Sequence, residues 1–124
     1  MNDNARTAFA EVIGEGDQTA LLLGPEGTVI AGIYLDSVGT DVSGEIGRAL
    51  GPVGEEVTRA MRHLGMGEWR AIVCECADAN LALSPASDGE VIVVAASPLV
   101  PIGFVRRLLD RVAVRATVWR REAA

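Results

Sequence analysis

Hydrophobic positions along the chain switch between helical spacing and short continuous runs. Residues 5–13 space their apolar side chains by three and one, which predicts a short amphipathic helix. Two continuous apolar runs follow, at residues 20–23 and 28–33, and a Gly-Pro-Glu-Gly turn separates them. This pattern predicts a β-hairpin. Because its runs do not alternate with polar residues, we expect helices on both faces of the sheet.

The longest periodic segment covers residues 42–64. Its apolar positions fall within an arc of about 120° on a helical wheel, which predicts a long central helix. Four glycines and Pro52 oppose that helix, since each glycine costs about 1 kcal/mol and an internal proline about 3 kcal/mol. We therefore expect packing within or between chains to support it, with a kink near Gly51 and Pro52.

Three further strands and a last helix complete the pattern. The strands are expected at residues 69–77, 80–83 and 91–96, and the helix from Ile102. Residues 114–121 fit the stripe of that helix poorly, so they could form frayed helix or an added strand. The order is helix, two strands, helix, three strands, helix. It predicts one α+β domain over residues 1–124, an α/β/α sandwich around a five-stranded antiparallel sheet.

Composition and charge exclude several functions. All 11 basic residues are arginine, so a P-loop and a Schiff-base enzyme lack their lysine. The net charge of −6 argues against a nucleic-acid partner. The charge is uneven, however: residues 1–100 carry 5 arginines and 15 acids, whereas residues 101–124 carry 6 arginines and 2 acids. A solvated helix face is the simpler explanation of the basic end, and a partner-binding patch is the alternative.

Candidate catalytic and metal-binding residues are few. The single histidine, His63, is expected on the exposed side of the central helix. Cys74 and Cys76 lie two apart in an expected strand and are interpreted as small core residues rather than zinc ligands. We therefore expect no enzyme activity, no metal and no cofactor. No segment has the length of a membrane span or the pattern of a signal sequence, which predicts a cytoplasmic protein without a membrane partner.

Several segments, in their order and spacing, resemble the Roadblock family of roadblock-type dynein light chains and bacterial regulators of Ras-like GTPases. They are the hairpin at residues 20–31, the glycine-rich helix after it, the turn and strand at 88–94, and the start of the last helix at 102–109. The resemblance covers about residues 5–113. It implies a non-enzymatic regulator or scaffold that binds a Ras-like small GTPase or a larger signalling or motility assembly.

The resemblance also implies where partners bind. A homodimer would pair residues 69–77 of two copies into one ten-stranded sheet, with the central helices side by side. The expected interface residues are Trp69, Ala71, Val73 and Glu75 in the strand, and Gly47 and Gly51 in the helix. The GTPase would dock over the paired helices and the adjoining sheet. Its expected contacts are on the exposed side of the helix, at Arg48, Glu55, Arg59 and Arg62.

One alternative remains open from the sequence. A small-ligand sensor of the profilin, PAS or GAF kind also surrounds an antiparallel sheet with helices. Such a sensor needs a pocket, which the 4% aromatic content disfavours.

Overall fold

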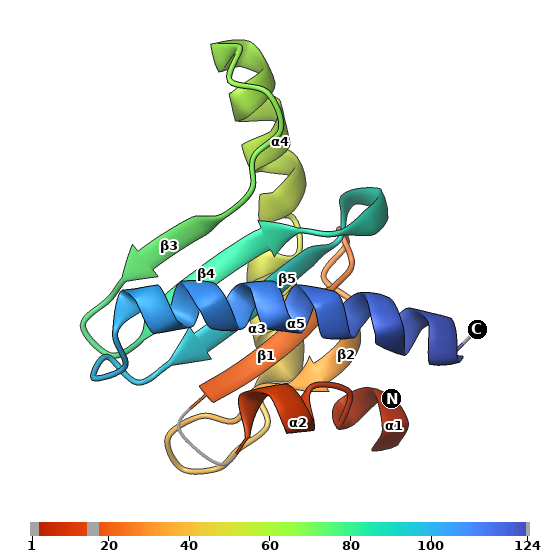
Figure 1. Cartoon of the computed structure of the whole chain (residues 1–124), viewed down its shortest axis with the longest axis vertical. Helices are drawn as coiled ribbons and strands as arrows, with labels where there is room; N and C mark the ends of the chain where they lie inside the picture. Colours follow the sequence, from red (N-terminus) through yellow and green to blue (C-terminus); the bar gives the residue numbers. More distant parts are fainter. Residues whose placement is uncertain (1–2, 15–17, 124) are drawn as a thin grey trace.

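Five strands form one antiparallel sheet between two layers of helices (Figure 1). The computed structural model describes residues 3–14 and 18–123. Along the sheet the strands are ordered β2-β1-β5-β4-β3, and every neighbouring pair is antiparallel. The strands are β1 (Gln18–Leu23), β2 (Val29–Ile33), β3 (Ile72–Glu75), β4 (Asn80–Pro85) and β5 (Val91–Ala96). This arrangement confirms the predicted α+β sandwich.

Helices cover both faces of the sheet, as the continuous apolar strands predicted. One face packs against α1 (Asp3–Arg6), α2 (Ala10–Ile13) and α5 (Ile102–Ala123); the other packs against α3 (Ser43–Leu50) and the first turn of α4 (Val53–Leu64). Neighbouring residues of one strand serve opposite cores. Leu22 and Ile92 face α5, whereas Leu21 and Val93 face α3. Because alternate side chains of a strand point to opposite faces, one sheet contributes to two hydrophobic cores.

The first predicted helix is divided into two. The chain turns at residues 7–9 between α1 and α2. Ala8 and Ala10 each donate their N–H to the carbonyl three residues earlier, at 3.3 and 3.1 Å, so the turn is tighter than an α-helix. Ala5, Ala8 and Phe9 nevertheless all reach the core. The apolar spacing thus identified the buried side of this segment and missed its break.

The central segment bends where the sequence predicted a kink. Gly51 still donates its N–H to the Gly47 carbonyl at 2.8 Å, and the helix is interrupted at residues 51–52. Pro52 has no N–H to donate, which explains why the interruption occurs there. The expected single helix over residues 42–64 is therefore α3 followed by α4.

Two glycines, one in α3 and one at its end, have a packing role within one chain; their expected part in a dimer interface stays a prediction. Gly47 and Gly51 are buried against the β1–β2 turn. A Cβ atom on Gly47 would lie 2.5 Å from the Gly27 carbonyl oxygen, and one on Gly51 would lie 2.5 Å from that of Gly24. These glycines let the helix and the turn approach each other closely.

Residues 114–123 continue α5 as helix, which settles the two alternatives left by the sequence. Ala116 and Trp119 extend the buried stripe beyond Val112. Val114 and Val118 are apolar but exposed on the opposite side of the helix, which is why the helical spacing of apolar residues is hard to recognise in this segment. None of the described helices, α5 included, combines the length and the apolar character needed to cross a bilayer.

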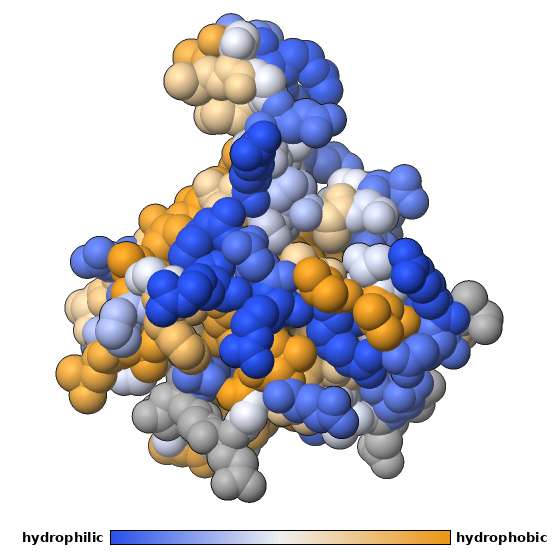
Figure 2. Space-filling view, viewed as in Figure 1, coloured by the Kyte–Doolittle hydropathy of each residue, from blue (hydrophilic) through white to orange (hydrophobic). Residues whose placement is uncertain are grey.

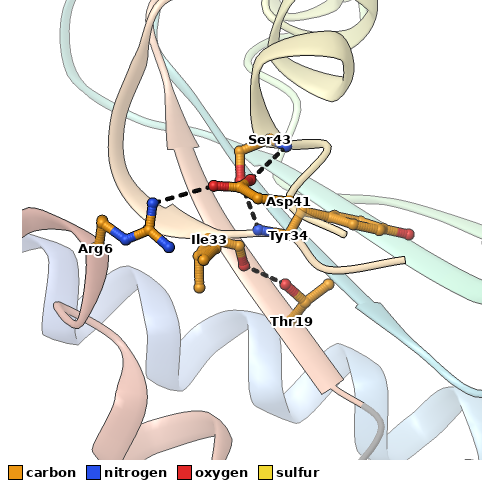
Figure 3. Close-up of polar contacts among 6 residues, drawn as sticks. All are labelled: Arg6, Thr19, Ile33, Tyr34, Asp41 and Ser43. Atoms are coloured by element: carbon orange, nitrogen blue, oxygen red, sulfur yellow. Dashed lines mark hydrogen bonds and ion pairs between the residues drawn. The ribbon is translucent and has the colours of Figure 1, made fainter. Parts of the chain in front are cut away.

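Polar contacts fasten the start of α3 to β2 and α1 (Figure 3). The Asp41 carboxylate accepts the N–H of Ser43 at 2.9 Å and pairs with Arg6 at 3.1 Å, and the Ser43 hydroxyl accepts the N–H of Tyr34 at 2.7 Å. Hydrogen bonding by the Ser43 side chain and backbone, with a smaller effect of Arg6, holds the pKa of Asp41 below its usual range. The loop before α3 is thereby held in place.

Candidate functional site

Helix α4 leaves the sheet after its first turn and projects from the body of the molecule (Figure 1). At its base, a Cβ atom on Gly54 would lie 3.6 Å from the Cβ of Val91 in β5. The Trp69 indole Nε1 donates to the Thr58 hydroxyl at 3.0 Å, and that hydroxyl donates to the Gly54 carbonyl at 2.9 Å. These contacts fix the base of α4, and no element of residues 3–14 and 18–123 covers its C-terminal half.

A cleft of about 350 Å³ lies between α4 and the β4–β5 turn. We call it the α4 cleft; its α4 wall is formed by Gly54, Glu55, Thr58, Arg59 and Arg62, and its other wall by Pro85, Ala86, Gly89 and Glu90. A neighbouring hollow of about 730 Å³ shares Thr58 and Arg62 and extends to Trp69. The two together form an open groove along the inner side of α4.

Three of the four residues expected to contact a partner gather in this cleft. Glu55, Arg59 and Arg62 line it, whereas Arg48 lies on α3 outside it; all four are exposed. Arg59 pairs with Glu56 at 2.9 Å, one turn away. Arg62 makes no ion pair within residues 3–14 and 18–123. Of the cleft's two arginines, Arg62 is therefore the one whose charge is available to a partner.

Sequence reasoning missed the second wall of the cleft. The β4–β5 turn contains a short 3-10 helix, Ser87–Gly89, with Asp88 in the left-handed region at φ 57°. Glu90 pairs with Arg120 and so ties the turn to α5. The Asp-Gly pair in the sequence signals a tight turn. It carries no information about which helix that turn will face.

Strand β3 is an edge of the sheet and is shorter than expected. Among the strands that the structure describes, it pairs with β4 alone. The strand expected over residues 69–77 covers only Ile72–Glu75, because the Trp69 side chain packs with the core beneath α3 and bonds to Thr58. Val73 and Glu75 are exposed on the edge strand, whereas Trp69 and Ala71 precede it and are partly buried.

An uncovered apolar surface runs along the projecting part of α4. Leu64 and Met66 are 65% and 71% exposed, and Met61 on the same helix is only partly buried. Figure 2 shows hydrophobic side chains at this end of the molecule. The apolar stripe that predicted the helix thus has two parts: the first, at Val53, packs on the sheet and the second faces outward.

The residues considered for chemistry do not assemble into a site. His63 is exposed on α4, as expected. The interpretation of both cysteines as core residues is wrong for Cys76, which is exposed beyond the end of β3, and only partly right for Cys74, which is half-buried. Across residues 3–14 and 18–123, no three His, Cys, Asp or Glu side chains converge as metal ligands would.

No protein-family model matches the sequence, and no curated protein is similar enough to count as a relative. Solved structures do match. A Roadblock/LC7 domain from Streptomyces avermitilis is 17% identical with a TM-score of 0.72, and 96% of this chain aligns with 98% of that one. Gliding protein MglB from Thermus thermophilus is 17% identical with a TM-score of 0.75 over 98% and 95% of the two chains. Myxococcus xanthus MglB is 15% identical with a TM-score of 0.70 over 98% and 94%.

Proposed function

We propose that this chain, which has the Roadblock/LC7 fold, is a homodimeric, non-enzymatic module that regulates or scaffolds a small Ras-like GTPase. One observation supports the proposal most: two surfaces are left unpaired in this chain, namely the edge of the sheet at β3 and the exposed apolar end of α4. The solved MglB structures with the same fold support a regulatory role, since the Roadblock resemblance implies regulation of such GTPases.

A second copy of the chain satisfies both uncovered features. An open edge strand presents unpaired backbone N–H and C=O groups, and pairing with another strand removes them from water. Two β3 strands related by a two-fold axis pair antiparallel, as an isologous dimer requires. The Roadblock resemblance implies that the central helices of the two copies lie side by side, and in such a dimer the apolar side chains of Met61 and Leu64 would contact the other copy.

The expected GTPase contacts then lie on the helical side of this dimer. The α4 cleft offers Arg62, with no ion pair in the described chain, beside Arg59 and Glu55. Arg48 lies farther along the same helical layer, on α3. No catalytic group is needed from this chain, because binding alone can position or restrain a GTPase.

Light scattering on a size-exclusion column tests the dimer. We expect a dimer for the unchanged chain at micromolar concentration and a monomer for Leu64→Asp, because the variant buries a charge in the α4 contact. Leu99→Asp is the matched control: Leu99 is 91% exposed in the loop before α5, and its replacement leaves the dimer intact. A monomeric unchanged chain refutes the dimer.

Calorimetric titration with a purified Ras-like GTPase of the same organism, loaded with GDP or a GTP analogue, tests the partner. We expect Arg62→Ala to weaken binding about tenfold or more, and Arg59→Ala to have a smaller effect because that side chain already pairs with Glu56. Absence of binding in both nucleotide states contradicts the GTPase assignment and leaves the dimer result standing.

A further inference from the structure

We propose that the outward side of α5 is a docking site for an acidic amphipathic helix of a partner protein. The side consists of Arg107, Arg111, Val114, Val118 and Arg121, which we call the α5 ridge. It belongs to the helical layer on the other face of the sheet from α3 and α4. The inference is therefore independent of the proposed dimer and of the α4 cleft.

The five residues of the α5 ridge share one line along the helix. At about 100° per residue they fall within an arc of roughly 80°, opposite the buried stripe that includes Val112 and Ala116. Val114 and Val118 stand one turn apart and are 67% and 38% exposed. Figure 2 shows hydrophobic side chains among hydrophilic ones along this helix. The ridge thus has an apolar centre and cationic ends.

A groove beside the two valines can receive an apolar side chain. It has a volume of about 430 Å³ and is lined by Val12 of α2 together with Asp110, Arg111, Val114, Arg115 and Val118 of α5. Arg115 Nε donates to the Ala8 carbonyl at 3.0 Å, which holds the turn before α2 against α5. The groove is shallow and open to solvent, and its two sides come from elements that this bond holds together.

The arginines of α5 divide into two groups according to their ion pairs. The three off the α5 ridge are paired within the chain: Arg106 with Asp110, Arg115 with Glu122, and Arg120 with Glu90. The side chains of Arg107, Arg111 and Arg121 make no ion pair or hydrogen bond with any residue that the structure describes. The unpaired cations flank the apolar centre on both sides, which is the complement of a helix with a small apolar patch between carboxylates.

Charge decides between possible occupants of the α5 ridge. An isologous contact with a second copy would place arginines opposite arginines, which is repulsive. A membrane surface is disfavoured because the chain carries a net charge of −6, and because helices that lie in lipid present large Trp, Phe or Leu side chains, whereas the ridge has only two valines. An acidic helix meets both the charge and the small apolar area.

The test uses a fluorescein-labelled helical peptide with two leucines one turn apart and glutamates one turn beyond each on the same side. We expect anisotropy to report binding to the full chain, about tenfold weaker for Val114→Thr/Val118→Thr and for Arg107→Gln/Arg111→Gln. The valine change keeps the side-chain shape and the β-branch, so it leaves the fold intact. Binding should also weaken as salt is raised.

Two matched controls decide the outcome. Arg106→Gln/Arg120→Gln removes the same charge away from the α5 ridge and should change the affinity less than twofold. A peptide of the same composition with its glutamates on the opposite side should not bind. Equal losses in both arginine pairs, no binding of the designed peptide, or preference for phosphatidylcholine–phosphatidylserine vesicles over the peptide would each overturn the proposal.

Discussion

Two glycines determine how closely α3 approaches the hairpin turn. Gly51 illustrates the limit, because an added Cβ would lie 2.5 Å from the Gly24 carbonyl oxygen and 2.7 Å from the Gly27 Cα. Both neighbours are backbone atoms, so neither can rotate away as a flexible side chain would. The helix would have to move from the turn and lose part of its contact with Leu23 and Val29.

Replacement of Gly51 by alanine should therefore destabilise the protein despite alanine's better helix propensity. We expect the free energy of unfolding, measured in urea, to fall by about 1–3 kcal/mol, the usual cost of overpacking a core. Gly44→Ala is the control: it adds the same atom on the same helix, 3.7 Å from the flexible end of Arg48. That variant should be about 0.5–1 kcal/mol more stable. Similar effects of the two substitutions would contradict this role for Gly51.

The lowered pKa of Asp41 predicts a pH dependence of stability. A carboxyl group whose pKa is lower in the folded chain stabilises it above the unfolded pKa of about 4, and this contribution is lost as pH falls through the folded value. We expect Asp41→Asn to unfold at lower urea concentration than the unchanged chain at pH 7. The difference between the urea midpoints of the two proteins should disappear as the pH falls below about 4.

Arg6→Gln separates the causes of that shift. The Ser43 hydrogen bonds have the larger effect on the pKa of Asp41 and Arg6 the smaller one, so this variant should retain most of the pH dependence. If the difference in urea midpoint between Asp41→Asn and the unchanged chain stays constant from pH 7 to pH 3, ionisation of Asp41 does not contribute to stability and the prediction is wrong.

At the scale of elements, β3 carries both cysteines of the chain to the open edge of the sheet. Cys74 lies in the strand and Cys76 is exposed just after it. If two β3 strands pair antiparallel with Cys74 of each copy directly opposite the other, their Cα atoms lie about 4.5–5.5 Å apart, within the range of about 4.4–6.8 Å that a disulfide needs. Disulfide formation between two copies of the unchanged chain can therefore report the proposed β3 pairing.

Mild oxidation of the unchanged chain should therefore give a covalent dimer on a non-reducing gel. The band should disappear in Cys74→Ser/Cys76→Ser and fall sharply in Leu64→Asp, which keeps both thiols and disrupts the α4 contact. Equal cross-linking in Leu64→Asp and the unchanged chain would show that the disulfide reports random collision rather than a preformed pair.

The sequence predicted the bounds of elements that depend on neighbouring residues, and it did not predict the bounds of elements that depend on contacts with residues far along the chain. Strand β5 has the predicted bounds because six consecutive apolar residues between turns leave little choice. The strand expected from Trp69 was too long, since the Thr58 hydroxyl that draws this indole away belongs to another element. The α4 cleft was half predicted: periodicity identified the charged side of α4, whereas its facing wall comes from a turn some 30 residues later.

At the scale of the whole molecule, the proposed contact between the exposed apolar surfaces of two α4 helices predicts that stability depends on protein concentration. A protein that folds as a dimer gains about 1.4 kcal/mol of apparent stability for each tenfold rise in concentration. We expect the thermal midpoint to rise by about 2–4 °C per tenfold, and Leu64→Asp to show a lower, constant midpoint. A midpoint of the unchanged chain that does not depend on concentration would contradict an obligate dimer.

The small-ligand alternative is tested on the same scale. A thermal-shift screen with nucleotides and metabolites should leave the midpoint unchanged, whereas a specific ligand at about 100 times its dissociation constant would add about 2.7 kcal/mol. A reproducible shift from one compound class, retained in Leu64→Asp, would favour a sensor over a dimeric regulator.

The open edge of β3 has a consequence for fidelity of assembly. The backbone hydrogen bonds of a strand pair depend on strand direction and spacing and hardly on the side chains. Any other chain of this fold in the same cell, with an unpaired β3, would therefore compete for pairing with this edge strand. In the proposed dimer, discrimination between self and paralogue must then come from the end of α4 and the turn after it, where Met61 is half-buried and Leu64 and Met66 are exposed. Exchange of those three residues between two chains of this fold should therefore redirect subunit choice and leave each sheet unchanged.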